Sequence, residues 1–138
     1  MNTIAKSLWT AVVLGSCVVA AGEALAAGRP ADAILKDLEA VEMPKLDASK
    51  RNDQAYVREY LAKRQETLDK RAALALELYK TAPNHARVPE LMVARWRMSI
   101  RPTGLSIEDF LKEIDQVLTQ ATDSKFKLEA IFTKAQLK

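Results

Sequence analysis

The chain has 138 residues, of which 49% are hydrophobic and 28% charged, and its formal net charge is +3. Such a length suits one small domain, and so mild a positive balance gives no reason to expect a nucleic-acid-binding protein. A single cysteine, Cys17, and a single histidine, His85, exclude an intrachain disulfide, a Cys-x-x-Cys redox pair and a His-rich metal site. We therefore expect no metal and no cofactor.

The start of the chain has the order of a bacterial secretory signal. Lys6 supplies a positive charge, residues 8–21 are uncharged and mostly apolar, and residues 24–26 (Ala-Leu-Ala) offer a small-residue cleavage step. A membrane-spanning helix would need about 20 apolar residues, and Glu23 interrupts the run sooner. The pattern therefore predicts export rather than a spanning helix.

Residues 1–26 are accordingly expected to be removed, which leaves residues 27–138 as a helical domain in the periplasm or outside the cell. Cleavage one residue later is a close alternative. A further alternative comes from residues 14–17 (Leu-Gly-Ser-Cys), which resemble a lipobox in which Cys17 would be lipidated. The chain stays apolar after Cys17, whereas the mature end of a lipoprotein is usually polar, so lipidation is the less favoured outcome. Membrane contact is expected only through the signal or this anchor.

The remainder is rich in helix-favouring residues and nearly free of glycine. The first helix is expected over residues 30–42, with Pro30 in its opening turn, and a polar connector over residues 43–52 follows it. Residues 53–138 are expected to form helical hairpins. The apolar stripe of the first helix contains Ile34, Leu35, Leu38 and Val41.

The second helix is predicted over residues 53–81, with Asp53 as its N-cap. Its last part, residues 72–79, is apolar nearly all round, which predicts neighbours on more than one side. One face carries Val57, Leu61, Leu68, Ala72, Ala75 and Tyr79.

The third helix is predicted over residues 89–100, with Pro89 in its first turn. It has two apolar stripes on nearly opposite sides, which is typical of a helix that lies between neighbours in stacked hairpins. One stripe contains Met92, Val93, Trp96 and Ile100, and the other contains Leu91, Ala94 and Met98.

The fourth helix has the clearest start signal. Ser106 is expected to cap it, with Asp109 completing a capping box and Leu105 packing on Phe110. Its core face is expected to contain Ile107, Phe110, Leu111, Ile114, Val117, Leu118 and Ala121.

Asp123 or Ser124 caps the fifth helix. The core stripe of that helix is expected to contain Leu128, Ile131, Phe132 and Ala135. This stripe still runs at Lys138, so whether Lys138 is the natural C-terminus stays open.

These elements predict an all-α fold of about five helices, in which antiparallel hairpins pack as a short tetratricopeptide-like α-solenoid or as an irregular bundle. Residues 55–60 (AYVREY) and 77–91 (ELYKTAPNHARVPEL) also resemble the helical N-terminal region of secreted bacterial thioredoxin-like (redoxin) proteins. In that family a signal peptide and a helical domain precede a thioredoxin fold. The resemblance implies export and an accessory or scaffolding role. This sequence contains neither a thioredoxin domain nor its Cys-x-x-Cys, so no redox residue carries over.

Candidate functional residues are few. The most basic stretch places Arg95, Arg97 and Arg101 around Trp96, as a conceivable partner surface. The arginines do not converge on a helical wheel, so we expect their guanidinium groups to reach water while their stems cover the edges of the core. His85 is expected to be a turn residue.

The carboxylates of the fourth helix, Glu108, Asp109, Glu113 and Asp115, are expected to form a solvated face, with Glu108 and Lys112 as an i,i+4 pair. We find no catalytic constellation in the sequence. We therefore expect an exported, non-catalytic interaction or scaffold module with a protein partner. The alternative is a small helical ligand-binding protein or enzyme with a pocket near Arg95 or His85.

Overall fold

The computed structural model describes residues 28–97 and 104–137. The predicted signal with Cys17, and Arg101 of the basic stretch, therefore lie outside the described residues. Within them the chain forms five α-helices and one short 3-10 helix and contains no strand, which confirms the all-α fold class. The elements are α1 (Ala31–Ala40), η1 (Ala48–Lys50), α2 (Gln54–Thr81), α3 (Val88–Trp96), α4 (Ile107–Gln120) and α5 (Ser124–Leu137).

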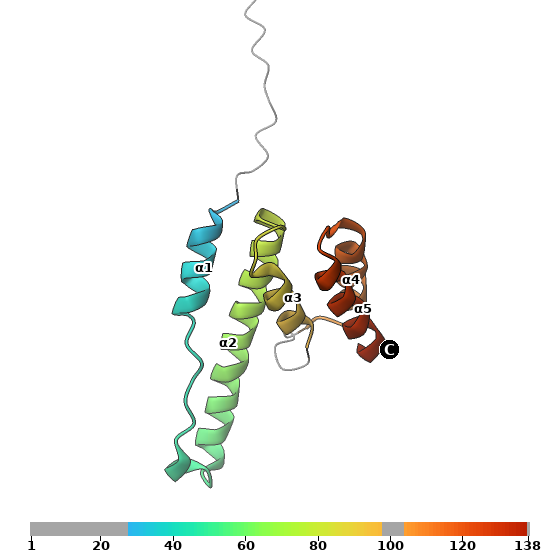
Figure 1. Ribbon diagram of the computed structural model, residues 1–138. Coiled ribbons are helices and arrows are strands. Elements are labelled where there is room, and N and C mark those ends of the chain that lie inside the picture. Colours follow the sequence, from blue (N-terminus) through green and yellow to red (C-terminus); the bar gives the residue numbers. More distant parts are fainter. Residues whose placement is uncertain (1–27, 98–103, 138) are drawn as a thin grey trace, which may run out of the picture.

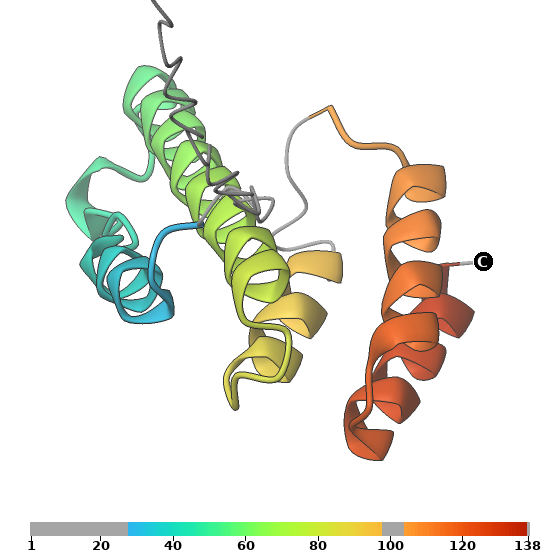
Figure 2. The same ribbon diagram turned by 90° about the horizontal axis from the view of Figure 1, so that it is seen from above.

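The helices lie in a row of packed pairs (Figures 1 and 2). Helix α2 packs against α1 on one side and α3 on the other, α5 packs against α3, and α4 packs against α5. Only the C-terminal part of α2 has buried side chains, and these lie between Leu68 and Tyr79. The N-terminal part runs beside the connector that follows α1 (Figure 1), where the Asp47 backbone N–H donates to the Tyr56 hydroxyl at 2.9 Å. The long helix therefore extends past the helical body.

One hydrophobic core joins all five helices. Trp96 of α3 is fully buried at its centre, and its ring stacks on Phe126 of α5 with centroids 5.9 Å apart and planes 5° apart. Burying such aromatic rings is a large part of what stabilises a small domain. The largest fully buried side chains are Trp96, Phe110, Ile34, Leu78, Met92, Ile114, Val88 and Val117.

Three helix starts have the caps that their sequences predict. The Asp53 carboxylate accepts hydrogen bonds from the backbone N–H groups of Ala55 and Tyr56. Ser106 and Asp109 form the reciprocal capping box at α4, and hydrogen bonds from the Ser106 hydroxyl and backbone hold the pKa of Asp109 below its usual range. At α5 the cap is Asp123, which accepts from the N–H groups of residues 125 and 126.

Several predicted core positions are wrong. Leu61 of α2 is 51% exposed, because its part of the helix extends past the body, and Ile107 of α4 is 39% exposed. The stripe predicted for α5 faces solvent instead of the core.

No helix within the described ranges is long and apolar enough to cross a membrane.

Candidate interaction surface

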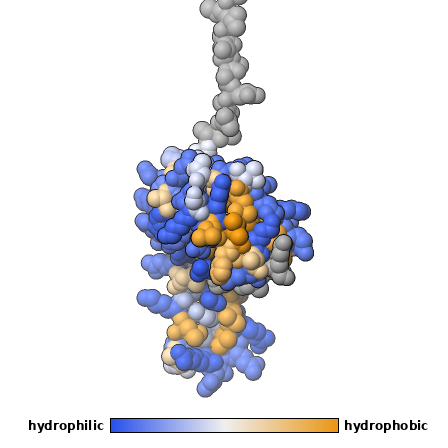
Figure 3. Space-filling model, turned by 45° about the vertical axis from the view of Figure 1, so that its right-hand side comes forward, coloured by the Kyte–Doolittle hydropathy of each residue, from blue (hydrophilic) through white to orange (hydrophobic). Residues whose placement is uncertain are grey.

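The outer face of α5, which we define as Leu128, Ile131 and Phe132, is exposed. These side chains are 66%, 54% and 60% accessible to solvent. Figure 3, turned so that the side of α4 and α5 comes forward, shows hydrophobic side chains gathered within a hydrophilic surround. An apolar cluster of this kind on a small protein is often an interaction site.

The exposure follows from a second apolar stripe on the same helix. Phe126, Ala130 and Thr133 face inward and are buried. At 3.6 residues per turn, Leu128 and Ala130 point to nearly opposite sides of the helix. Burying one stripe therefore exposes the other. Both apolar stripes can be read in the sequence. The stripe with the larger side chains is the one predicted to be buried, and it is the one that the structure exposes.

Beside the outer face runs a groove between α3 and α5, with a volume of about 620 Å³. Its apolar lining includes Pro89, Val93 and Ala94 of α3 and Phe126 of α5. The charged residues along it are Glu90, Arg97, Asp123, Lys125 and Glu129. Lys125 and Glu129 precede Leu128 and Phe132 by three positions, which places each pair on neighbouring positions of the helix surface. The groove and the outer face of α5 therefore adjoin along these two charged residues.

The predicted arginine surface does not form as a unit. Arg95 is 4% exposed and Trp96 is fully buried, so neither is available to a partner. The expectation that the Arg95 guanidinium reaches water is wrong. Arg97 is exposed and borders the α3–α5 groove.

The carboxylate of Glu113 stabilises the buried guanidinium of Arg95. The Arg95 Nε and Nη2 groups donate to the two carboxylate oxygens of Glu113 at 2.8 and 3.0 Å, and Nη1 donates to the Ala72 carbonyl of α2 at 2.9 Å. Trp96 Nε1 donates to Glu113 Oε1 at 2.8 Å. The carboxylate therefore satisfies buried donors, and the prediction of a solvated Glu113 is wrong. Its position beside Phe110 and Val117 on the helix surface was the signal for its burial.

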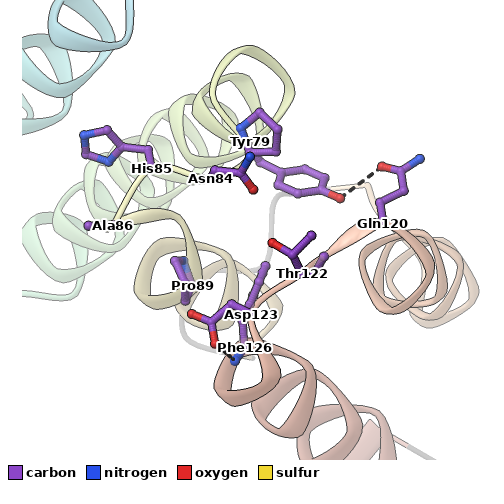
Figure 4. Close-up of a pocket in the computed structure, with 11 residues that line it drawn as sticks. Tyr79, Asn84, His85, Ala86, Pro89, Gln120, Thr122, Asp123 and Phe126 are labelled. Atoms are coloured by element: carbon purple, nitrogen blue, oxygen red, sulfur yellow. Dashed lines mark hydrogen bonds between the residues drawn. The ribbon is translucent and has the colours of Figure 1, made fainter.

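A second cleft, of about 330 Å³, lies between the α2–α3 turn and the α4–α5 turn (Figure 4). The Tyr79 hydroxyl donates to Gln120 Oε1 at 3.2 Å across it, and burial raises the pKa of the Tyr79 phenol. His85 lines one end with its ring turned away from Gln120 and Asp123. Its Nδ1 accepts from the Arg87 backbone N–H at 3.2 Å, as a turn residue does.

In residues 28–97 and 104–137, no three His, Cys, Asp or Glu side chains group closely enough to hold a metal ion. Among the carboxylates of α4, Asp109 caps the helix and Asp115 pairs with Lys134 of α5. Comparison of the chain with protein-family models, with curated proteins and with solved structures finds no match.

Proposed function

We propose that this chain is an exported, non-catalytic helical module that binds another protein through the outer face of α5. The observation that carries the proposal is the exposure of three large apolar side chains, Leu128, Ile131 and Phe132, on one helix face. Contact of such an apolar cluster with water is unfavourable, and a partner that covers the cluster would remove this cost while it is bound.

The roles of the polar side chains support a non-catalytic module. Arg95 and Glu113 neutralise each other inside the protein, and Asp109 and Asp123 cap helices. A catalytic acid or base needs free access to substrate and a second group to orient it. These residues are instead committed to holding the helices.

Export and membership of the thioredoxin-like accessory regions are part of the same proposal. They rest on the signal-like order of residues 1–26 and on the resemblance of residues 77–91. The intact mass of the protein recovered from the cell envelope tests the first point. Cleavage near Ala26 gives an unmodified, cysteine-free chain, whereas lipidation adds the mass of acyl groups to Cys17.

Site-specific photo-crosslinking tests the binding role. A photoreactive amino acid at Phe132 is expected to give one discrete adduct with another protein in living cells. The matched control is Leu61, which is also exposed but lies on α2. Absence of an adduct at Phe132, or the same adducts at both positions, would contradict the proposal.

A second candidate function is binding of a small ligand in the cleft between the two turns. It is favoured by the convergence of Tyr79 of α2 with Gln120 and Asp123 of the α4–α5 turn, which lie about 40 positions further along the chain. It predicts that a bound compound shifts the NMR signals of these residues together, and that Tyr79→Phe weakens the binding. A library screen in which only residues of the outer face of α5 respond would remove this candidate.

A further inference from the structure

The first described residues, Gly28 and Arg29, lie against the C-terminal end of α2 (Figure 1). A Cβ added at Gly28 would come within 2.9 Å of the Thr81 hydroxyl oxygen, so the backbone there packs closely on the last residue of the helix. The Arg29 guanidinium donates from Nε and Nη2 to the two carboxylate oxygens of Glu77, at 2.8 and 2.9 Å, and from Nη1 to Asp37 of α1. We call these contacts the N-terminal clasp, because they join α1 to α2 through the first residues of the described structure.

The clasp lies directly beside the predicted cleavage step. Cleavage between Ala26 and Ala27 leaves only Ala27 in front of Gly28. A site that recognises an extended peptide binds it through its main chain, so a peptidase has to take up the residues on both sides of the bond that it breaks. Arg29 cannot enter such a site while it is paired with carboxylates of two helices.

Pro30 holds the same stretch from its other side. Its carbonyl accepts from the backbone N–H groups of Ala33 and Ile34 at 3.0 and 3.2 Å, and the Ile34 side chain is fully buried. An exposed ion pair is weak by itself, but a guanidinium that binds both oxygens of one carboxylate fixes the geometry as well. Drawing residues 28–30 into an active site would therefore break the pairs of Arg29 and disturb the start of α1.

Resting on the proposed export, we infer that the clasp controls removal of the signal. The precursor is cleaved while residues 28–30 are off α2, and closure of the clasp on an uncleaved chain shields the cleavage step. The reaction is hydrolysis of the Ala26–Ala27 peptide bond by a signal peptidase, in which water supplies the hydroxyl of the new carboxyl group and a proton of the new amine. Folding and processing compete, and a precursor that folds first keeps residues 1–26.

Cleavage rates measured in vitro test the inference. The substrate is the purified full-length chain, folded in a mild non-ionic detergent, and the enzyme is a purified bacterial signal peptidase. Mass spectrometry follows the appearance of residues 27–138. A synthetic peptide of residues 1–36 contains the cleavage step but neither Asp37 nor Glu77, so it gives the rate without the clasp. We expect the folded chain to be cleaved at least tenfold more slowly than the peptide.

Variants that leave residues 1–36 unchanged identify the cause. Asp37→Asn with Glu77→Gln removes both carboxylates that bind Arg29 and is expected to raise the rate for the folded chain at least fivefold, and Glu77→Gln alone by a smaller factor. The matched control is Glu39→Gln, which removes the pair of α1 with Arg87 instead and is expected to leave the rate unchanged. Circular dichroism and urea unfolding check that each variant is folded.

The outcomes separate the inference from the export on which it rests. Equal rates for the folded chain and the peptide would overturn the inference and leave export standing. A slow folded chain whose two Glu77 variants are equally slow would overturn it too, because the shielding would then have another cause. If neither the chain nor the peptide is cleaved near Ala26, the predicted signal is wrong and the inference falls with it.

Discussion

At the scale of single residues, the interior depends on one carboxylate. Glu113 is the acceptor for both Arg95 and Trp96 of α3, and Arg95 in turn binds the Ala72 carbonyl of α2. The side chains of Arg95 and Glu113 are 4% and 15% exposed. A buried charge is tolerated only when it is paired and hydrogen-bonded, so each member of this group makes the burial of the others possible.

Glu113→Ala is therefore expected to lower the free energy of unfolding by about 3–5 kcal/mol, because it leaves the Arg95 charge buried without a counter-ion. Arg95→Met combined with Glu113→Gln removes both charges and keeps an acceptor for the Trp96 N–H. This double variant is expected to lose less than half as much. Urea unfolding of the purified variants gives both values. If Glu113→Ala lowered the free energy of unfolding less than the double variant does, the burial of Arg95 would not depend on Glu113.

At the scale of the helix, the structure decides which of two candidate residues, Asp123 or Ser124, caps the start of α5. The Asp123 carboxylate accepts from the backbone N–H groups of Lys125 and Phe126 at 2.7 and 3.2 Å. Ser124 is the first residue of the helix. Asp123→Ala is expected to cost about 1 kcal/mol, whereas Ser124→Ala is expected to cost nothing, because alanine is the better helix former. Equal losses in urea unfolding would mean that Ser124 takes part in the cap.

The two faces of α5 give a sharper contrast, because each carries a phenylalanine. Phe126 is 2% exposed and stacks on Trp96, and Phe132 is 60% exposed. Phe126→Ala is expected to lower the free energy of unfolding by about 3–5 kcal/mol, through lost burial and a cavity. Phe132→Ala is expected to change it by less than about 0.5 kcal/mol. A large loss of unfolding free energy in the Phe132 variant would contradict this orientation of α5, because it would mean that Phe132 faces the core.

At the scale of the whole molecule, the predictable features are the local ones. Helix starts depend on residues within three positions of each other, so Asp53 and Ser106 could be identified from the sequence. The pairing of Arg95 with Glu113 joins residues 18 positions apart on different helices, and no local pattern encodes which carboxylate an arginine will find. For α5, two opposite stripes made either orientation compatible with the spacing, and packing against both α3 and α4 decided between them.

The α1–α2–α3 and α4–α5 parts of the chain meet through a few strong contacts, and these predict how the molecule unfolds. The Trp96–Phe126 stack, the Arg95–Glu113 pair and the Tyr79–Gln120 hydrogen bond all cross between them. Neither part can release Trp96 and Glu113 without exposing buried groups of the other. The described helices are therefore expected to unfold as one cooperative unit.

Trp96 can report on this interface because the chain has only two tryptophans, Trp9 and Trp96. In a Trp9→Phe background, fluorescence follows the contact between the two parts, while far-ultraviolet circular dichroism follows all the helices. The two signals are expected to give the same urea midpoint. Tyr79→Phe, which removes one bridging hydrogen bond, should lower both midpoints together, by an amount equivalent to about 1 kcal/mol. A fluorescence transition at clearly lower urea would mean that the two parts separate before either unfolds, and that the bridging contacts are weaker than the packing inside each part.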